Sequence, residues 1–146
     1  MNLRHAHQIR KTLSANDLGL TGSHQAGVLV PRVESILGFF PPLDSSTLNP
    51  RIDLLVRDDM DSAWRFVLIH YNNRLVANGT RNEYRLTHMT GFLRNNSAQP
   101  GDVLSFERVG GHFRARVEHS RNATPERLSD DVLRLSGSWR VVRINP

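Results

Sequence analysis

The chain of 146 residues contains no cysteine and a single lysine, Lys11. Without cysteine it has no disulfide bond, no thiolate zinc site and no cysteine nucleophile, so we expect a reducing, cytoplasmic compartment. Nuclease motifs of the Asp…(Asp/Glu)-x-Lys type need acidic residues ahead of a lysine, and none precedes Lys11. The chain therefore cannot form that motif.

Long hydrophobic runs are also missing from the sequence. No apolar stretch approaches the ~20 residues that span a bilayer. Residues 1–7 lack the apolar region of a signal peptide. Since the length suits one hydrophobic core, we expect residues 1–146 to form a single domain without a membrane segment.

Acidic residues are outnumbered, with 14 of them against 19 basic residues, and all the basic residues except Lys11 are arginines. A nucleic-acid partner would explain this excess, and so would the codon usage of a GC-rich genome. The distribution of the charges is more informative. Residues 1–32 and 74–94 each carry four basic residues and one acidic residue, whereas residues 43–62 between them carry five aspartates and two arginines. Uniform codon usage does not predict two basic stretches around an acidic one.

The pattern of apolar residues predicts a mainly β structure. Alternating or continuous apolar runs predict strands at 27–30, 52–56, 64–71, 103–108, 113–117 and 139–144. One short helix is expected over 31–37 and a second from Thr124 to Gly137, with Thr124 as its N-cap. Because no βαβ alternation occurs, we expect a closed or partly closed barrel, in which residues 40–50 form a long loop.

The segment 13–27 is small, polar and punctuated by glycine. Several of its side chains can hydrogen-bond to phosphates and base edges, namely Ser14, Asn16, Asp17, His24 and Gln25. An ordinary loop stabilised by Asx and Ser/Thr turns would have a similar composition.

A second polar segment covers residues 71–85. Within it Arg81, Glu83 and Arg85 are two residues apart, so in an extended chain they point the same way. This trio suits a G·C pair, because arginine binds guanine O6 and N7 while glutamate accepts from cytosine N4. The alternative is an arginine–glutamate ion-pair ladder on a sheet surface.

The aspartates of residues 57–61 raise the question of a metal site. Carboxylates in one loop are usually just solvated, and here the partner carboxylates, general base and lysine of a metal-dependent nuclease are missing. Phosphate-binding, dinucleotide-binding and zinc-protease motifs are also missing. We therefore predict no catalytic residue, no metal and no cofactor.

At the two polar segments the sequence resembles the N-terminal effector-binding domain of the EcoRII-type restriction endonucleases. The resemblance extends from about Lys11 to Thr87, and two separated motifs occur in the order of that family. Its first motif is matched by Leu13–Asp17, Thr21-Gly22, His24-Gln25 and Gly27, and its second by Tyr71-Asn72, Arg74, Thr80–Glu83 and Arg85.

The resemblance implies a DNA-binding pseudobarrel of about seven strands and two short helices, shared with plant-type transcription factors. Two arms, built from the two segments, would grip the major groove of double-stranded DNA and recognise a short site with C/G flanks and an A/T centre. In that family a monomeric domain binds this site, and binding relieves inhibition of a separate C-terminal nuclease domain. The implied DNA-binding positions are Lys11, Ser14, Asn16, Asp17, His24, Gln25, Arg74, Thr80, Arg81, Asn82, Glu83, Tyr84 and Arg85.

Three positions depart from the family pattern. A tyrosine of the family is Leu29 here, and two lysines are replaced by Gly79 and Tyr84. Two phosphate-binding side chains are therefore absent. Alternative functions are a stand-alone transcription regulator, an RNA-binding barrel, and a small metal-dependent nuclease that would use residues 58–61.

Overall fold

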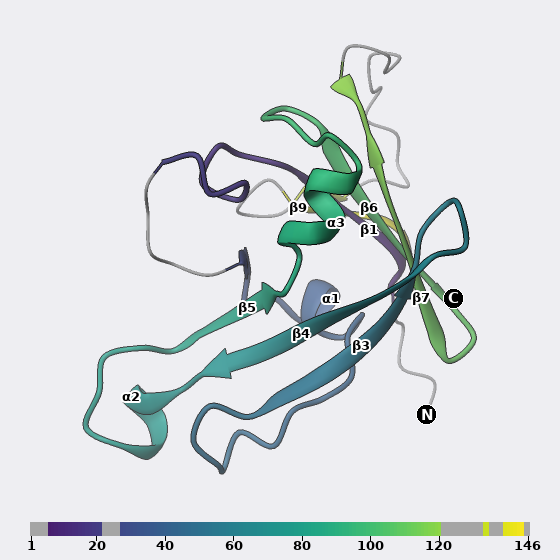
Figure 1. Ribbon diagram of the computed structural model, residues 1–146. Coiled ribbons are helices and arrows are strands. Elements are labelled where there is room, and N and C mark those ends of the chain that lie inside the picture. Colours follow the sequence, from purple (N-terminus) through teal and green to yellow (C-terminus); the bar gives the residue numbers. More distant parts are fainter. Residues whose placement is uncertain (1–5, 22–26, 121–132, 135–138, 145–146) are drawn as a thin grey trace.

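The computed structural model describes residues 6–21, 27–120, 133–134 and 139–144. Within these ranges the chain forms one curved sheet of nine strands and three short helices (Figure 1). The strands are β1 (Ala6–Thr12), β2 (Val28–Val30), β3 (Arg51–Arg57), β4 (Ala63–Tyr71), β5 (Glu83–Thr87), β6 (Val103–Val109), β7 (His112–Glu118), β8 (Leu133–Arg134) and β9 (Trp139–Ile144). The helices are α1 (Glu34–Leu37), α2 (Asn73–Val76) and α3 (Thr90–Asn95).

The strand order is β2-β5-β4-β3-β7-β6-β1-β9-β8. Neighbouring strands are antiparallel except β3 and β7, which pair in parallel at Val56–Phe113 and Arg57–Arg114. β2, at one end of this order, contacts β9, the strand next to the other end, because the indole Nε1 of Trp139 on β9 donates to the carbonyl oxygen of Leu29 on β2 at 3.0 Å. A side chain, rather than a backbone ladder, thus closes the curled sheet into a pseudobarrel.

Aromatic rings fill the interior of the pseudobarrel. Phe66 of β4 packs edge-on against Phe92 of α3 and Phe106 of β6, with ring centroids 5.3 and 5.9 Å apart. Phe39, just after α1, approaches Phe106 at 6.3 Å. All four of these side chains are fully buried. Buried aromatic pairs of this geometry stabilise a core beyond the effect of burial alone.

The mainly β pseudobarrel predicted for the chain is confirmed, as are all six predicted strands, to within two residues at each end. Three strands (β1, β5 and β8) and two helices (α2 and α3) are additional. The helix predicted from Thr124 to Gly137 is wrong where the structure describes it. Leu133 and Arg134 instead pair with Val141 and Arg140 of β9, so sheet pairing overrides helical propensity there. The rest of that predicted helix lies outside the described residues.

Gly27 ends the polar segment 13–27, which we call arm 1, and leads into β2 through a backbone conformation that favours glycine, with φ at +77°. A Cβ atom at this position would lie 2.2 Å from the carbonyl oxygen of Leu86 on β5. Only glycine can therefore let the chain enter β2 this close to β5, which fixes where arm 1 leaves the barrel.

Candidate nucleic-acid interface

Arm 2 is the hairpin of β4 and β5, which extends from the barrel with α2 near its tip (Figure 1). The tip is organised by Asn73, whose Oδ1 accepts from the backbone N–H of Arg81 at 2.8 Å. The backbone N–H of Arg74 donates to the carbonyl of Arg81 at 2.9 Å. A Cβ on Gly79 would lie 2.2 Å from Cγ of Asn73. The glycine at 79 is therefore required by the packing of this tip.

The front face of arm 2 consists of Tyr71, Arg81, Glu83 and Arg85. Tyr71 and Glu83 are opposite each other in the antiparallel ladder, and the Arg81 guanidinium carbon lies 3.9 Å from the centroid of the Tyr71 ring. Glu83 Oε1 accepts from Arg81 Nε at 3.1 Å and also from Arg81 Nη2. Arg85 makes longer contacts to the same carboxylate, at 3.3 and 3.4 Å. The structure thus confirms that the three charged residues share one face.

Burial and charge differ along the front face. The Arg85 side chain is 4% exposed, Glu83 26% and Arg81 42%, so Arg81 is the most accessible member of the trio. Burial by itself raises the pKa of Glu83, but hydrogen bonds and charges from Arg81 and Arg85 outweigh it, and the net pKa lies below its ordinary value. At neutral pH Glu83 is therefore an ionised carboxylate that only accepts hydrogen bonds.

The back face of arm 2 consists of His70, Asn82 and Tyr84. Strand alternation turns these side chains away from the front face, and the His70 and Tyr84 rings stack in parallel with centroids 4.0 Å apart. His70 Nε2 lies 2.7 Å from Asn82 Oδ1, and His70 Nδ1 lies 2.9 Å from Ser45 Oγ. Two of the predicted DNA-binding residues, Asn82 and Tyr84, thus point toward the protein interior.

Arm 1 comprises residues 13–27, of which 13–21 and 27 are described. Ser14 and Asp17 exchange two hydrogen bonds between side chain and backbone, at 2.9 and 3.1 Å. Thr21 Oγ1 donates to Asn16 Oδ1 at 2.9 Å. Lys11 of β1 forms a 2.9 Å ion pair with Asp17, and both side chains are 7% exposed. The charge of Lys11 is therefore neutralised inside the protein, where it holds arm 1 against the barrel.

The two arms are connected through Leu29 of β2. Leu29 pairs with Arg85 in the ladder of β2 and β5, and it is 46% exposed. It also lines a cavity of about 780 Å³ at the base of arm 1, together with Lys11, Asn16, Asp17, Pro31, Arg32 and Val33. Arg32 is exposed at this cavity. Arg32 was not among the predicted DNA-binding residues. Its place in the first basic stretch, residues 1–32, was the signal in the sequence that could have identified it.

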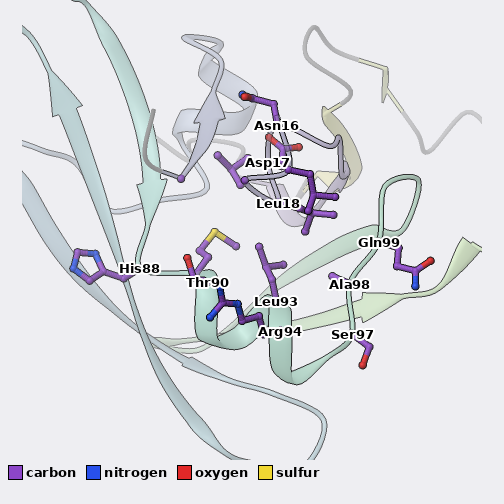
Figure 2. A pocket seen from close by; sticks show the side chains of 15 residues that line it. Asn16, Asp17, Leu18, His88, Thr90, Leu93, Arg94, Ser97, Ala98 and Gln99 are labelled. Atoms are coloured by element: carbon purple, nitrogen blue, oxygen red, sulfur yellow. The ribbon is translucent and has the colours of Figure 1, made fainter. Parts of the chain in front are cut away.

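A second cavity, of about 660 Å³, separates arm 1 from α3. Figure 2 shows Asn16, Asp17 and Leu18 on one side of it and Thr90, Leu93 and Arg94 on the other. Arg94 is exposed and ends the second basic stretch, so it too is a cationic candidate that was not among the predicted residues.

Of the remaining predicted residues, Ser14, Asn16, Arg74 and Thr80 are exposed. The structure brings Arg74 to Arg81 through the backbone and leaves Thr80 beside the tip. His24 and Gln25 lie outside the described residues.

The acidic loop is a folded turn built around Asp58. Its carboxylate accepts from the indole of Trp64 and from the backbone N–H groups of Met60 and Ser62, each at 2.9 Å. The bond from Trp64 is the main cause of a lowered pKa for Asp58. Among the residues that the structure describes, no group of three or more acidic, histidine or cysteine side chains is placed to hold a metal ion.

Comparison with known proteins places these arms in a family. The family described as "Restriction endonuclease EcoRII, N-terminal" matches residues 4–106, which include both arms. The chain belongs to the EcoRII N-terminal domain family. Within the described ranges, none of its helices has the length and apolar character needed to cross a membrane.

Two curated proteins share sequence with this EcoRII N-terminal domain. The type II restriction enzyme EcoRII of Escherichia coli is 42% identical over 84 residues, covering 53% of this chain and 19% of that enzyme. Auxin response factor 2 of Oryza sativa subsp. japonica is 32% identical over 123 residues, covering 82% of this chain and 16% of that protein. The chain thus spans less than a fifth of the length of either relative.

The fold is also found among solved structures. The protein of the Arabidopsis FUS3-DNA complex superposes with a TM-score of 0.56 at 17% identity, covering 75% of this chain and 94% of that one. At this identity the similarity establishes the shared fold, and the nine-stranded pseudobarrel described above is therefore the same architecture.

Proposed function

We propose that this domain binds a specific short sequence of double-stranded DNA and acts as the effector domain of a type II restriction endonuclease. The observation that carries the proposal is the front face of arm 2, a preformed arginine–glutamate–arginine cluster in a member of the EcoRII N-terminal family. The DNA complex of the structurally similar Arabidopsis protein supports the same class of ligand.

The geometry of Arg81 suits guanine recognition. Glu83 binds the Nε edge of the guanidinium, and Tyr71 lies against its plane. The Nη1–Nη2 edge is the remaining one with two parallel N–H groups, which is the arrangement that guanine O6 and N7 accept in the major groove. Since Tyr71 and Glu83 already hold the side chain, little conformational entropy is lost on binding.

Glu83 would supply the complementary acceptor. Its Oε1 is shared by both arginines, whereas Oε2 has one long contact to Arg85 at 3.4 Å. Oε2 is thus the oxygen with capacity to accept from cytosine N4–H. Cations at the tip and at arm 1, Arg74 and Arg32, would contact phosphates and fix the register of the duplex.

For the members of the predicted set whose side chains are engaged within the protein we propose supporting roles. Lys11 and Asp17 would hold arm 1 through their ion pair, while Asn82 and Tyr84 would hold arm 2 from its back face. The exposed side chains of Ser14, Asn16 and Thr80 remain proposed DNA contacts, as do His24 and Gln25. Residues 1–146 would form one monomeric domain of a longer cytoplasmic enzyme, attached to a nuclease domain.

Selection of bound sequences from a random duplex pool tests the proposal. We expect enrichment of one short motif with C/G flanks, and a pool without enrichment would contradict sequence-specific binding. Competition with double-stranded and single-stranded RNA provides the control, because A-form major grooves are too narrow to admit the arms. A preference for RNA would favour the RNA-binding alternative.

The absence of catalysis is tested separately. We propose that the 146-residue chain has no nuclease activity of its own. Incubation of plasmid DNA with the purified domain and magnesium should leave the plasmid intact over hours. Cleavage that survives further purification, and that is lost in a variant of Asp59 and Asp61, would instead support the metal-dependent nuclease.

A further inference from the structure

We infer that His70 is a positioning residue for sequence recognition, acting from the back face of arm 2 on the front-face side chains Arg81 and Glu83. This inference rests on the proposed DNA-binding function. His70 is 3% exposed, and the side chains on either side of it in β4, Ile69 and Tyr71, point to the opposite face. It is therefore too buried to contact a duplex, and its effect must pass through the residues that it binds.

Asn82 lies between Arg81 and Glu83 in the chain. The ladder between β4 and β5 ends at the pair Tyr71–Glu83, so Asn82 lies just beyond it. The side chain of Asn82 is held instead by His70 Nε2 at 2.7 Å. Because Asn82 turns to the back, its neighbours on both sides turn to the front. The bond to His70 thus sets the rotation of the strand that presents Arg81 and Glu83.

The imidazole of His70 is contacted at both of its ring nitrogens. Asn82 Oδ1 can only accept, so His70 Nε2 carries the hydrogen of this bond. Nδ1 lies 2.9 Å from the hydroxyl oxygen of Ser45, which can act as donor or acceptor to it. The Tyr84 ring, stacked at 4.0 Å, fixes the plane of the imidazole. Both nitrogens and one ring face are engaged, which leaves His70 a single orientation.

His70 is supported from behind through Ser45. Ser45 belongs to a loop that is attached to the arm by the fully buried Asn72. The Asn72 amide donates to the carbonyls of Ser45 and Thr47 at 3.1 and 2.8 Å, and its Oδ1 accepts from the N–H of Asn49 at 2.8 Å. His70 therefore contacts a loop whose position is itself fixed by Asn72. Because that loop is fixed, its contact with His70 restrains the position of arm 2.

The experiment compares His70→Phe, which keeps an aromatic ring against Tyr84 but removes both hydrogen bonds, with the wild-type chain. Affinity is measured for the selected duplex and for a scrambled duplex of the same length, at the same salt concentration. We expect affinity for the selected duplex to fall roughly three- to tenfold, the range for loss of one hydrogen bond, because only the bond to Asn82 acts directly on the strand that carries Arg81 and Glu83. Affinity for scrambled DNA should stay within about twofold, because it depends on phosphate contacts.

Two further variants separate positioning from general stability. Asn82→Ala removes the same hydrogen bond from a more accessible site, so it tests the inference if His70→Phe does not fold. The double variant should lose no more specificity than either single one, since both remove one constraint. Leu104→Ala is the control, because it opens a cavity at β6, which pairs with neither strand of arm 2. Below its unfolding temperature it should leave the affinity ratio of the two duplexes unchanged.

These measurements distinguish failure of the positioning role of His70 from failure of the proposed DNA-binding function. If wild-type protein prefers one duplex and both His70→Phe and Asn82→Ala keep that preference, the positioning role of His70 is wrong while DNA recognition stands. An equal loss on both duplexes would also overturn it. If wild-type protein prefers no duplex, the proposed function itself fails.

Discussion

The guanidinium of Arg81 is held on its face by Tyr71 and along one edge by Glu83. The Arg81 side chain is therefore charged and accessible, but it loses little conformational entropy when it binds a ligand. A contact made by a preorganised arginine is expected to discriminate between base pairs, whereas a freely moving arginine would mostly follow phosphate charge.

Arg81→Ala should therefore weaken binding to the preferred duplex by roughly 1–3 kcal/mol and binding to random DNA by much less. Titrations of both duplexes at one salt concentration measure the two losses. Arg114→Ala is a matched control, since Arg114 is half exposed on β7 and carries the same charge. Equal losses of affinity on both duplexes would show that Arg81 contacts phosphates and not bases.

The acid sensitivity of arm 2 follows from Glu83. Its pKa is lowered in the folded protein, so the stability it contributes is complete above its unfolded value, near 4.5, and is lost as pH falls through the lower folded value. Unfolding monitored from pH 7 to pH 3 should thus show a smaller loss of stability in Glu83→Gln than in the wild type. Identical profiles below pH 4.5 would mean that the ion pairs do not stabilise the fold.

At the level of elements, arm 2 depends on its tip. Asn73 holds the backbone of Arg81, and the space beside Asn73 has no room for a side chain on residue 79. The lysine that the family carries at this position therefore cannot be restored without moving the residue that orients Arg81.

Gly79→Ala should lower stability by about 1–3 kcal/mol, the usual cost of overpacking, and should weaken specific binding along with it. Thermal unfolding and titration with the selected duplex measure the two effects. Gly111→Ala provides the control, because a Cβ in the turn between β6 and β7 meets no atom within 4 Å. Full retention of both properties by Gly79→Ala would show that the tip can rearrange.

Elements with a regular apolar pattern could be predicted from the sequence, and β4 is the clearest case. β1 could not, because its inward positions are Ile9 and Lys11, and a lysine there interrupts the apolar alternation. Lys11 is tolerated inside only because Asp17, from a loop that follows, neutralises it. One-turn helices such as α2 and α3 have too few residues to show any periodicity.

The candidate site was predictable to a similar extent. The spacing of Arg81, Glu83 and Arg85 indicated a common face, and the structure confirms it. The same alternation turns Asn82 and Tyr84 to the opposite face, but the motif itself could not show that His70 lies there and engages both side chains. Tertiary partners decide which members of a motif are available to a ligand.

For the whole molecule, the basic stretch that flanks arm 1 and the one that includes the tip of arm 2 lie on either side, in the sequence, of an acidic stretch that contains the folded turn of Asp58. Such a domain should grip the duplex backbone as well as its bases. The logarithm of the binding constant should then fall linearly with the logarithm of salt concentration, with a slope of about −0.9 for each phosphate neutralised.

Arg74→Ala, at the exposed tip of arm 2, should reduce the magnitude of this slope by roughly 1, while Arg114→Ala should not change it. Fluorescence anisotropy titrations at several salt concentrations provide the slopes. A flat salt response of the wild-type domain would contradict a clamp that contacts the backbone.

The bond between Trp139 and Leu29 has a consequence for biosynthesis. It joins residues 110 positions apart, and β9, which carries Trp139, is also the strand that covers the free edge of β1. While the chain is being translated, β1 can pair with β6, but its other edge stays open until β9 has left the ribosome. Arm 1 and Leu29 are therefore held by the complete barrel only after Trp139 has been added, so the DNA-binding surface becomes competent only once β9 has joined the sheet.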